Sequence, residues 1–318
     1  MTAFYPVLSD ILAAAERIAP HVRRTPVLTS ASLDRMAGAE LFFKAEMFQA
    51  VGAFKARGAT NAVLRLTGDE AARGVATHSS GNHAAALARA AGLRGIAATI
   101  VMPSNAPAAK QESVRRYGGQ IVFCEPTLAA REAAAAQVVA RTGAVLIHPY
   151  DNADVIAGQG TAALELLEQA PGLDLVLAPV GGGGLISGTA IACRGLASDL
   201  EVIGVEPAGA DDAWRSLAAG QLVEAGPVDT IADGLRGQLS ERTLAIIQQD
   251  VARIVTVSEA SIVQAMRLLW AVLKVVAEPS AAVAYAAILE GKVDVAGQRV
   301  GIILTGGNLD LDHLPWQS

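Results

Sequence analysis

Short apolar runs alternate with helical stretches along most of the chain. Each run, such as residues 95–103 or 173–180, ends in small or polar residues, and a helical stretch follows it. This alternation is typical of βαβ units, in which parallel strands form a sheet and helices cover its faces. The chain has 318 residues, enough for more than one such sheet. We therefore expect an α/β protein with two open, twisted parallel sheets.

The positions of these runs predict two domains. Residues 66–149 read as a compact α/β block, which we expect to be a small domain. A second series of strands and helices follows it and, together with residues 1–65, predicts a large domain of 1–65 and 150–318. Active sites in open α/β folds lie at the carboxyl ends of the strands. The small and polar residues that follow the apolar runs are therefore the first places to look for function.

Composition excludes several classes of protein. The net charge is −6 and no basic stripe stands out, which argues against binding to nucleic acid. Apolar residues make up 52% of the chain, but charge, Gly or Pro interrupts every run before the ~18 residues of a membrane span. The first residues do not read as a signal peptide. Cys124 and Cys193 are the two cysteines, which predicts neither a disulfide framework nor a zinc site. We expect a cytoplasmic protein.

Four consecutive glycines, Gly181–Gly184, follow a buried apolar run and precede a helix. Such a run costs backbone entropy, which is tolerated where a ligand must approach the main chain closely. We interpret it as a phosphate-binding loop. It does not match G-x-G-x-x-G, because the third glycine position falls on Ile186 or Ser187, and this argues against a dinucleotide.

Three further segments place small or polar residues beside a helix or after a strand. The segment "SSGNHAAALARA" (79–90) is either a carboxylate or phosphate site at a helix start or an ordinary capped helix. The segment "TGGNLD" (305–310) is either a tight turn or a place where Thr305 presents its hydroxyl to a ligand. In "GAFKARGATNA" (52–62), Lys55 is either a point charge for a phosphate or an amine for Schiff-base chemistry.

These segments resemble, in order and spacing, the motifs of fold-type II pyridoxal-phosphate enzymes. The chain is most similar to the group of serine racemases, threonine/serine dehydratases and 3-hydroxyaspartate dehydratases. The resemblance covers essentially the whole chain and includes "TPVLTS", "HPYDN", "VIAGQGT", "TIADG" and "EPSAAV". It implies a tryptophan synthase β-like fold, with the active site in the cleft between the two domains.

The resemblance implies a binding site for pyridoxal 5'-phosphate. Lys55 would bind this cofactor covalently, and Phe54 would pack against its pyridine ring. The backbone N–H groups of Gly181, Gly182, Gly183 and Gly184 would bind the phosphate. Asn82 would hydrogen-bond the phenolic oxygen, and Thr305 would face the pyridine nitrogen. A neutral hydroxyl at that nitrogen favours expulsion of a β-leaving group over transamination.

The implied reaction is α,β-elimination from a β-hydroxy amino acid, which yields a 2-keto acid and ammonia. Lys55 would remove the Cα proton, and Ser80 could exchange a proton on the opposite face, which makes racemisation a possible side reaction. The residues expected to bind the substrate are Ser79, Ser80, Gly81, Asn82, His83 and Arg131. A true amino-acid racemase is the alternative within this group. A nucleotide-binding dehydrogenase or a non-catalytic ligand-binding module is the alternative outside it.

Arg131 and "HPYDN" bear on the identity of the substrate. The second carboxylate of 3-hydroxyaspartate favours a bidentate guanidinium, and Arg131 is either that group or an ordinary surface arginine of a helix. The segment "HPYDN" and the last residues resemble the hydroxyaspartate dehydratases more than the serine racemases. We therefore favour 3-hydroxyaspartate slightly over L-serine or L-threonine.

The resemblance also implies a metal site, a nucleotide position and an assembly. Glu206, the carbonyl of Ala210 and Asp212 would bind Mg²⁺, Ca²⁺ or Mn²⁺, although two acids in a loop are also consistent with solvated charge. Ala50 stands where ATP-activated animal serine racemases carry a nucleotide-contacting lysine, which argues against ATP regulation. We expect a homodimer.

Overall fold

Two β-sheets form the framework of the molecule. The computed structural model describes residues 5–79 and 81–317. The larger sheet has six strands in the order β1-β2-β10-β7-β8-β9, and its pairs are parallel except for β1 with β2. These strands are β1 (Val27–Leu28), β2 (Glu40–Ala45), β7 (Leu175–Pro179), β8 (Glu201–Pro207), β9 (Arg253–Val257) and β10 (Arg299–Leu304).

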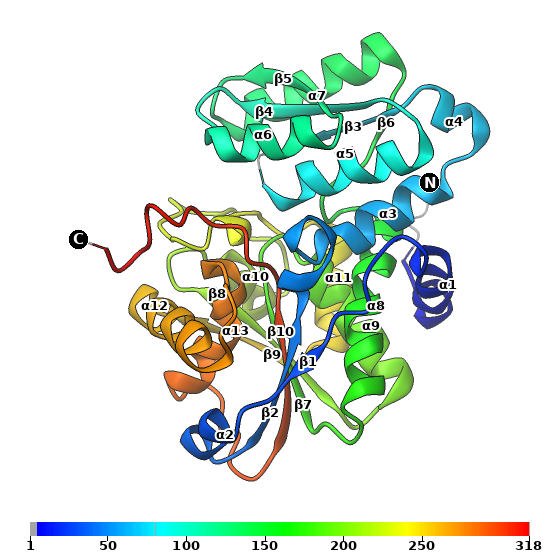
Figure 1. Cartoon of the computed structure of the whole chain (residues 1–318). Helices are drawn as coiled ribbons and strands as arrows, with labels where there is room; N and C mark the ends of the chain where they lie inside the picture. Colours follow the sequence, from blue (N-terminus) through cyan, green and yellow to red (C-terminus); the bar gives the residue numbers. More distant parts are fainter. Residues whose placement is uncertain (1–4, 80, 318) are drawn as a thin grey trace.

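The smaller sheet has four parallel strands in the order β5-β4-β3-β6. They are β3 (Val75–His78), β4 (Ala98–Pro103), β5 (Gln120–Cys124) and β6 (Val145–Leu146), and the helices beside them are α5 (Asn82–Arg94), α6 (Ala108–Arg116) and α7 (Leu128–Thr142). Figure 1 shows this layer stacked above the larger sheet. The predicted class, α/β with two open parallel sheets, is confirmed. The division into domains at residues 65 and 149 stays a prediction.

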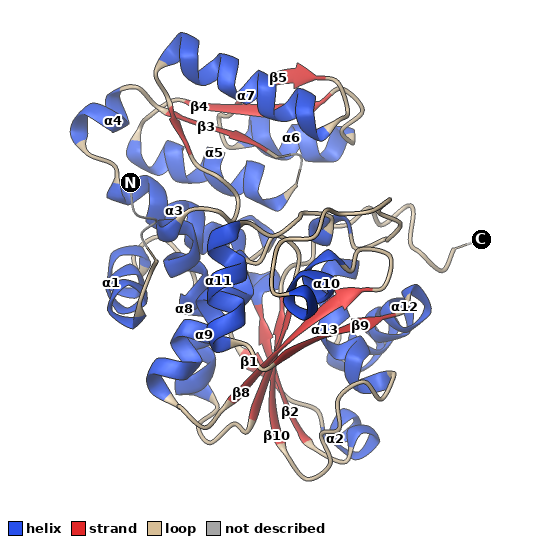
Figure 2. Cartoon of the chain, turned by 180° about the vertical axis from the view of Figure 1, so that it is seen from behind, coloured by secondary structure: helices blue, strands red, loops and turns tan. Residues whose placement is uncertain are grey.

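Helices cover both faces of the larger sheet (Figure 2). Side chains of β7 alternate between two hydrophobic clusters: Leu175 and Leu177 belong to one, and Val176 and Ala178 belong to the other. One cluster includes side chains of α2 (Ala31–Ala37), α12 (Glu259–Leu268) and α13 (Pro279–Leu289); the other includes those of α1 (Leu8–Ile18), α8 (Ala153–Gln169), α9 (Gly184–Leu196) and α11 (Glu241–Asp250). Burial on both faces explains why this strand reads as a continuous apolar run.

Helix α3 (Lys55–Arg65) packs against both α5 and α8 and so joins the two layers. The crossing of α3 and α8 is tight, because a Cβ atom on Gly158 would lie 2.6 Å from the Cα atom of Gly58. The remaining elements are α4 (Gly68–Ala72), α10 (Asp212–Ala219), the 3₁₀ turns η1 (Glu46–Phe48), η2 (Ala50–Gly52) and η3 (Asp233–Leu235), and the π-helical turn η4 (Leu269–Leu273). Within residues 5–79 and 81–317, no helix has the length and apolar character needed to cross a membrane.

Candidate active site

The first residue of α3 is Lys55, and the end of β10 determines where it lies. Ala53 pairs with Gly306 in an isolated antiparallel bridge. The next residue, Phe54, donates its backbone N–H to the carbonyl of Thr305 at 3.0 Å. These two contacts bring "GAFKARGATNA" and "TGGNLD", which are 250 residues apart in the chain, to the same end of the larger sheet. The predicted neighbourhood of Lys55 and Thr305 follows directly from this pairing.

The amine of Lys55 lies in a partly buried position between a carbonyl and an aromatic ring. Its Nζ donates to the carbonyl of Pro149 at 2.9 Å and lies 5.0 Å from the centre of the Phe54 ring. Burial lowers the pKa of Lys55 to about 8, because the charged form loses hydration. A larger share of this amine is therefore neutral near physiological pH than of an exposed lysine, and a neutral amine is the form that acts as nucleophile or base.

The glycine loop follows β7 and leads into α9, and no side chain fits on its inner positions. A Cβ atom on Gly182 would lie 2.2 Å from the ring of Tyr150. Gly183 has φ +84°, and a Cβ there would lie 2.7 Å from Thr243. The backbone N–H groups at the start of a helix attract anions. The loop therefore fits the phosphate of pyridoxal phosphate, and its glycines are required by the packing around it.

Thr305 and Asn82 are the two polar side chains predicted to face the cofactor ring. Thr305 follows β10, is buried, and its Oγ1 has no hydrogen-bond partner among the residues that the structure describes. An orphaned buried hydroxyl is costly, so a ligand atom that pairs with it gains free energy. Asn82 begins α5, and its side chain is held between Glu278 and Asn308, with hydrogen bonds of 2.9 Å to each. Both positions fit the cofactor.

The loop between β3 and α5 contains most of the predicted substrate-binding residues. Ser79 Oγ accepts the backbone N–H of Gly81 at 3.3 Å, which shapes the loop. Ser80 lies outside the described residues, and its predicted role stays a prediction. His83 is buried, with its Nε2 3.2 Å from the carbonyl of Ile147. Burial lowers the pKa of His83 to about 3, so this ring is neutral at physiological pH.

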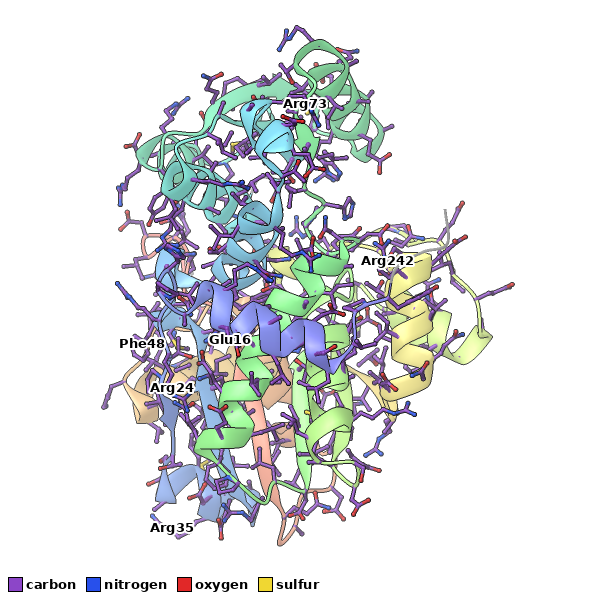
Figure 3. All side chains as sticks on the ribbon, turned by 90° about the vertical axis from the view of Figure 1, so that its right-hand side faces the viewer. Glu16, Arg24, Arg35, Phe48, Arg73 and Arg242 are labelled. Carbon is purple, nitrogen blue, oxygen red and sulfur yellow. The ribbon has the colours of Figure 1, made fainter. Side chains whose placement is uncertain are left out.

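Three aromatic side chains, those of His78, His148 and Tyr150, form an edge-to-face cluster beside the glycine loop. The rings of His78 and His148 have centroids 5.3 Å apart, and those of His148 and Tyr150 are 4.5 Å apart. Burial lowers the pKa of His148 to about 4 and raises that of Tyr150 to about 12, so both are neutral. Arg242 of α11, labelled in Figure 3, donates to Asp151 at 2.5 Å. In the sequence, the motif "HPYDN" contains two members of this cluster, His148 and Tyr150.

Arg131, on α7, is partly buried. Burial is the main cause that lowers the pKa of His78, and the positive charge of Arg131 adds to it. The same charge opposes the rise in the pKa of Tyr150. The charge of Arg131 therefore acts on two rings of this cluster. Its predicted contact with the substrate stays a prediction.

Glu206 and Asp212, the predicted metal ligands, are both buried; Glu206 lies near the carboxyl end of β8, and Asp212 is the first residue of α10. The oxygens of Glu206 accept the backbone N–H groups of Ala213 at 3.1 Å and Trp214 at 2.7 Å. One oxygen of Asp212 has no partner among the described residues. Burial raises the pKa of both carboxyls, that of Glu206 to about 9. Ala210, which would contribute its carbonyl, is also buried.

Two buried carboxyls suit a hard cation, because the cation offsets the cost of desolvating them. In the part of the chain that the structure describes, no group of three or more His, Cys, Asp or Glu side chains is arranged to hold a metal ion. The predicted set has only two such side chains and a carbonyl, so the metal site stays a prediction.

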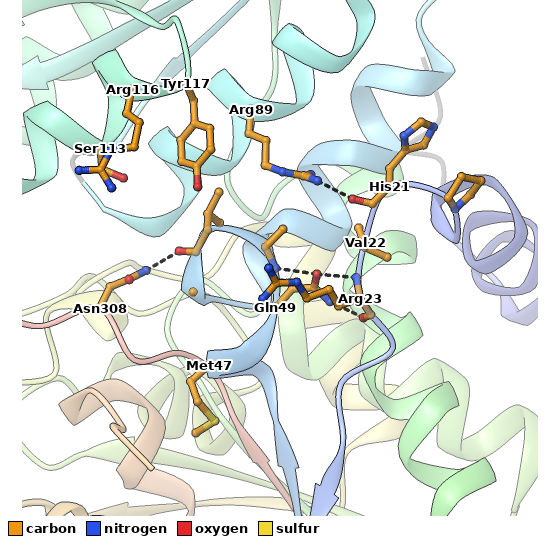
Figure 4. Close-up of a pocket in the computed structure, with 14 residues that line it drawn as sticks. His21, Val22, Arg23, Met47, Gln49, Arg89, Ser113, Arg116, Tyr117 and Asn308 are labelled. Atoms are coloured by element: carbon orange, nitrogen blue, oxygen red, sulfur yellow. Dashed lines mark hydrogen bonds between the residues drawn. The ribbon is translucent and has the colours of Figure 1, made fainter.

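A separate pocket of about 650 Å³ lies between residues 20–23, the turn η2 and helices α5 and α6 (Figure 4). Its basic side chains include Arg23, Arg89 and Arg116, and Asn308 lies at its edge. Ala50, the residue that argues against ATP regulation, also lines this pocket. The pocket is therefore positively charged. Ala50, however, gives it no cation at the position where the resemblance places a nucleotide-contacting lysine.

Known proteins resemble this chain over nearly its full length. The protein-family model for pyridoxal-phosphate dependent enzymes matches residues 18–306. A β-hydroxyaspartate dehydratase from Paracoccus denitrificans (strain Pd 1222) is 54% identical over 313 residues, covering 98% of this chain and 99% of the relative. An L-threo-3-hydroxyaspartate ammonia-lyase from Saccharomyces cerevisiae is 46% identical and covers 96% of this chain and 94% of the relative. The structure of maize serine racemase superposes with a TM-score of 0.95 at 46% identity, covering 97% of this chain and 95% of that one.

The chain belongs to the family of pyridoxal-phosphate dependent enzymes. The resemblance stated from the sequence motifs is thereby confirmed, and so is the expectation of an enzyme that uses pyridoxal phosphate. The alternatives of a nucleotide-binding dehydrogenase and of a non-catalytic ligand-binding module fall away.

Proposed function

We propose that this protein is a pyridoxal-phosphate dependent dehydratase that converts a β-hydroxy amino acid, preferably 3-hydroxyaspartate, into a 2-keto acid and ammonia. The observation that carries this proposal is Lys55, whose partly buried amine has a lowered pKa and lies beside Phe54 at the start of α3. Identity of 54% to a β-hydroxyaspartate dehydratase supports the choice of substrate.

Lys55 would hold the cofactor covalently, Phe54 would pack on its ring, and Gly181–Gly184 would bind its phosphate. Asn82 would donate to the phenolic oxygen, and the buried hydroxyl of Thr305 would pair with the pyridine nitrogen. Bound pyridoxal phosphate supplies an electron sink for the electron pair that remains at Cα when its proton is removed. Neutral Thr305 does not hold a proton on the pyridine nitrogen as a carboxylate would, which keeps that sink moderate.

The protein's own groups then act on the substrate. Once its amine is free, Lys55 would accept the Cα proton, and the bond from Cβ to the hydroxyl oxygen would break. That oxygen would take up one proton and leave as water, so that H from Cα and OH from Cβ together account for the water lost. The released enamine tautomerises to an imine, which takes up one water to give the keto acid and ammonia. The loop of Ser79 and Gly81, continued by Asn82, would bind the α-carboxylate, and Arg131 would bind the β-carboxylate through two parallel hydrogen bonds.

A racemase is the second candidate function, because the maize serine racemase structure is closely similar in fold and sequence. Both reactions begin with removal of the Cα proton and differ in whether a proton returns before the β-hydroxyl departs. Chiral analysis of unreacted substrate separates them: a dehydratase leaves its configuration unchanged, and a racemase does not. Ser80 is the proposed proton donor on the opposite face.

We also propose a divalent cation, an assembly and a location. Glu206, Asp212 and the carbonyl of Ala210 would bind Mg²⁺, Ca²⁺ or Mn²⁺, with water completing the oxygen shell. A homodimer is supported by the resemblance. Light scattering of the purified protein measures this directly. A cytoplasmic location agrees with the composition and stays a prediction.

The substrate assay compares hydroxyaspartate isomers, L-serine and L-threonine by keto-acid and ammonia release. We expect one hydroxyaspartate isomer to give the highest kcat/KM. Replacement R131A should lower that value about 10- to 100-fold, since a hydrogen bond to a charged group contributes about 1.5–3 kcal/mol, while the value for serine changes little. Arg141, an exposed arginine of the same helix, is the matched control as R141A. Faster turnover of serine, or equal losses in R131A for both substrates, would contradict the proposed specificity.

A further inference from the structure

The side chain of Asn82 is held in a closed ring of hydrogen bonds. Its Nδ2 donates to Oε1 of Glu278 at 2.9 Å and also lies 3.3 Å from Oε2. Its Oδ1 accepts from Nδ2 of Asn308 at 2.9 Å. The backbone N–H of Asn308 closes the ring by donating to Oε2 of Glu278 at 3.0 Å. Asn82 therefore has a defined orientation before any ligand binds.

The two partners of Asn82 are themselves anchored. Glu278 is buried at the start of α13, and its backbone N–H donates to the carbonyl of Gly306 at 3.0 Å. A Cβ on Gly306 would lie 2.8 Å from Oε1 of Glu278, so this glycine leaves the space that the carboxyl occupies. Asn308 also donates to the carbonyl of Val51 at 2.7 Å, and this bond is the dashed line that starts at Asn308 in Figure 4. The ring thus joins the turn before Lys55, the start of α5, the start of α13 and the end of β10.

An ionised carboxylate determines which atom of Asn82 faces it. A carboxylate only accepts hydrogen bonds, so the amide atom next to Glu278 must be the donor Nδ2. The oxygen of Asn82 is then turned to Asn308, whose amide donates to it. Of the two N–H groups on Nδ2, one is bound to Glu278 and the other remains available. On the side away from Asn308, Asn82 therefore presents an N–H group to a ligand rather than its oxygen.

We propose that Glu278 is a positioning residue for the cofactor, because it leaves Asn82 with only a donor to present to the phenolic oxygen of pyridoxal phosphate. The inference rests on the proposed function, which assigns Asn82 to that oxygen. A donated N–H stabilises the ionised phenolic oxygen, which belongs to the yellow form of the cofactor. An Asn82 amide turned the other way would direct its oxygen at that ion and disfavour this form.

The constraint depends on the charge of Glu278. Burial raises the pKa of this carboxyl to about 7, the charge of Asp233 in η3 adds to the rise, and Lys110 of α6 opposes it. Protonated Glu278 can donate, so it also tolerates the oxygen of Asn82 as a neighbour. The direction of the pH dependence follows from this. Glu278 fixes the orientation of the Asn82 amide above about pH 7 and no longer does so as the pH falls below that value.

The test compares visible spectra of the holoenzyme for wild type, E278Q and E290Q. Glutamine keeps the size of Glu278 but can donate as well as accept. Glu290 is the matched control, since it lies just beyond the other end of α13 and its carboxylate also accepts a backbone N–H, from Ser258 at 2.9 Å. We expect wild type and E290Q to lose part of the yellow band between about pH 8 and about pH 6, on either side of the Glu278 pKa. E278Q should show a weaker yellow band at both values and no such step, with a Kd for pyridoxal phosphate raised about tenfold.

An unchanged spectrum and Kd in E278Q, with the step retained, would overturn the proposal. Should E278Q fail to fold, the spectra of wild type and E290Q decide, because the hydrogen bonds between Glu278 and Asn82 are intact in both proteins. We expect both to lose part of the yellow band between about pH 8 and about pH 6, and an unchanged band in both would equally count against the proposal. Failure of the proposed function looks different: wild-type protein would bind no pyridoxal phosphate, or would bind it and release no keto acid from any substrate.

Discussion

At the scale of single residues, loss of hydration controls the chemistry of Lys55. Burial is the cause that lowers its pKa, and burial also lowers the pKa of His83 to about 3 and that of His148 to about 4. The surrounding rings are therefore uncharged at physiological pH and do not compete with Lys55 as cations. An amine in such a place is prepared to react with an aldehyde and to take up a proton afterwards.

The rate at which cofactor-free protein binds pyridoxal phosphate should follow the titration of Lys55. Only the neutral amine reacts, so the rate should rise about tenfold per pH unit below about pH 8 and level off above it. Stopped-flow absorbance of the yellow band measures this rate. The variant K55A should bind no cofactor covalently, as judged by mass spectrometry after borohydride reduction. A rate that keeps rising tenfold per unit up to the ordinary lysine pKa of 10.5 would show that burial does not act as described.

At the scale of elements, a buried ion network holds the first turn of α3. Arg57, two residues after Lys55, donates to both oxygens of Glu46 at 2.8 Å. It also donates to both oxygens of Glu165 on α8, at 2.7 and 2.8 Å. Lys44 of β2 reaches the same Glu165 at 2.6 Å. The network ties the helix that begins with Lys55 to a strand and a helix of the large-sheet layer.

Replacement R57M should lower the free energy of unfolding by about 3–5 kcal/mol, because it leaves the buried carboxylate of Glu46 without its cation. The surface pair of Arg24 and Glu168, 2.7 Å apart, offers the contrast, since both side chains are about half exposed (56% and 50%). Arg24 is labelled at the molecular surface in Figure 3. There R24A should cost less than about 1 kcal/mol. Urea unfolding monitored by circular dichroism measures both, and equal costs would contradict the role assigned to burial.

The crossing of α3 and α8 should be equally intolerant of added volume. A methyl group on Gly158 would lie 2.6 Å from the backbone of Gly58, so G158A should destabilise the fold by about 1–3 kcal/mol through overpacking. Gly68 is the control, because a Cβ there meets no atom within 4 Å and its backbone angle is ordinary. We expect G68A to be neutral or slightly stabilising. Thermal unfolding of both variants tests this, and a neutral G158A would show that the helices can separate.

At the scale of the whole molecule, the proposed cation would stabilise the larger sheet at the carboxyl end of β8. Removing divalent ions with EDTA should lower Tm, and added Mg²⁺ should restore it. At a hundredfold excess over its Kd, Mg²⁺ should raise the free energy of unfolding by ~2.7 kcal/mol. The variant E206Q should lose most of this response, since it removes one of the two carboxylates. E201Q, at the exposed start of the same strand, should keep it. No dependence of Tm on Mg²⁺ in wild type would refute the metal site.

Much of this molecule was predictable from local patterns. Alternating apolar and helical segments predict the α/β class, and the order of five motifs predicts the cofactor family; both are confirmed. The positions of Lys55, Asn82, the glycine loop and Thr305 were also predictable as motifs, though their roles stay predictions. Each of these signals is carried by residues adjacent in the chain, such as a strand end followed by a helix start.

Contacts between distant segments could not be read in this way. Tyr150 packs against Gly182, and Glu278 binds Asn82 across 196 residues. In the sequence, "HPYDN" and "EPSAAV" contribute to the family resemblance, but they predict no contact for Tyr150 or Glu278. Local periodicity and spacing carry information only about neighbours in the chain. Which carboxyl loses its water, and which amide it then orients, is decided when β10, α5 and α13 come together.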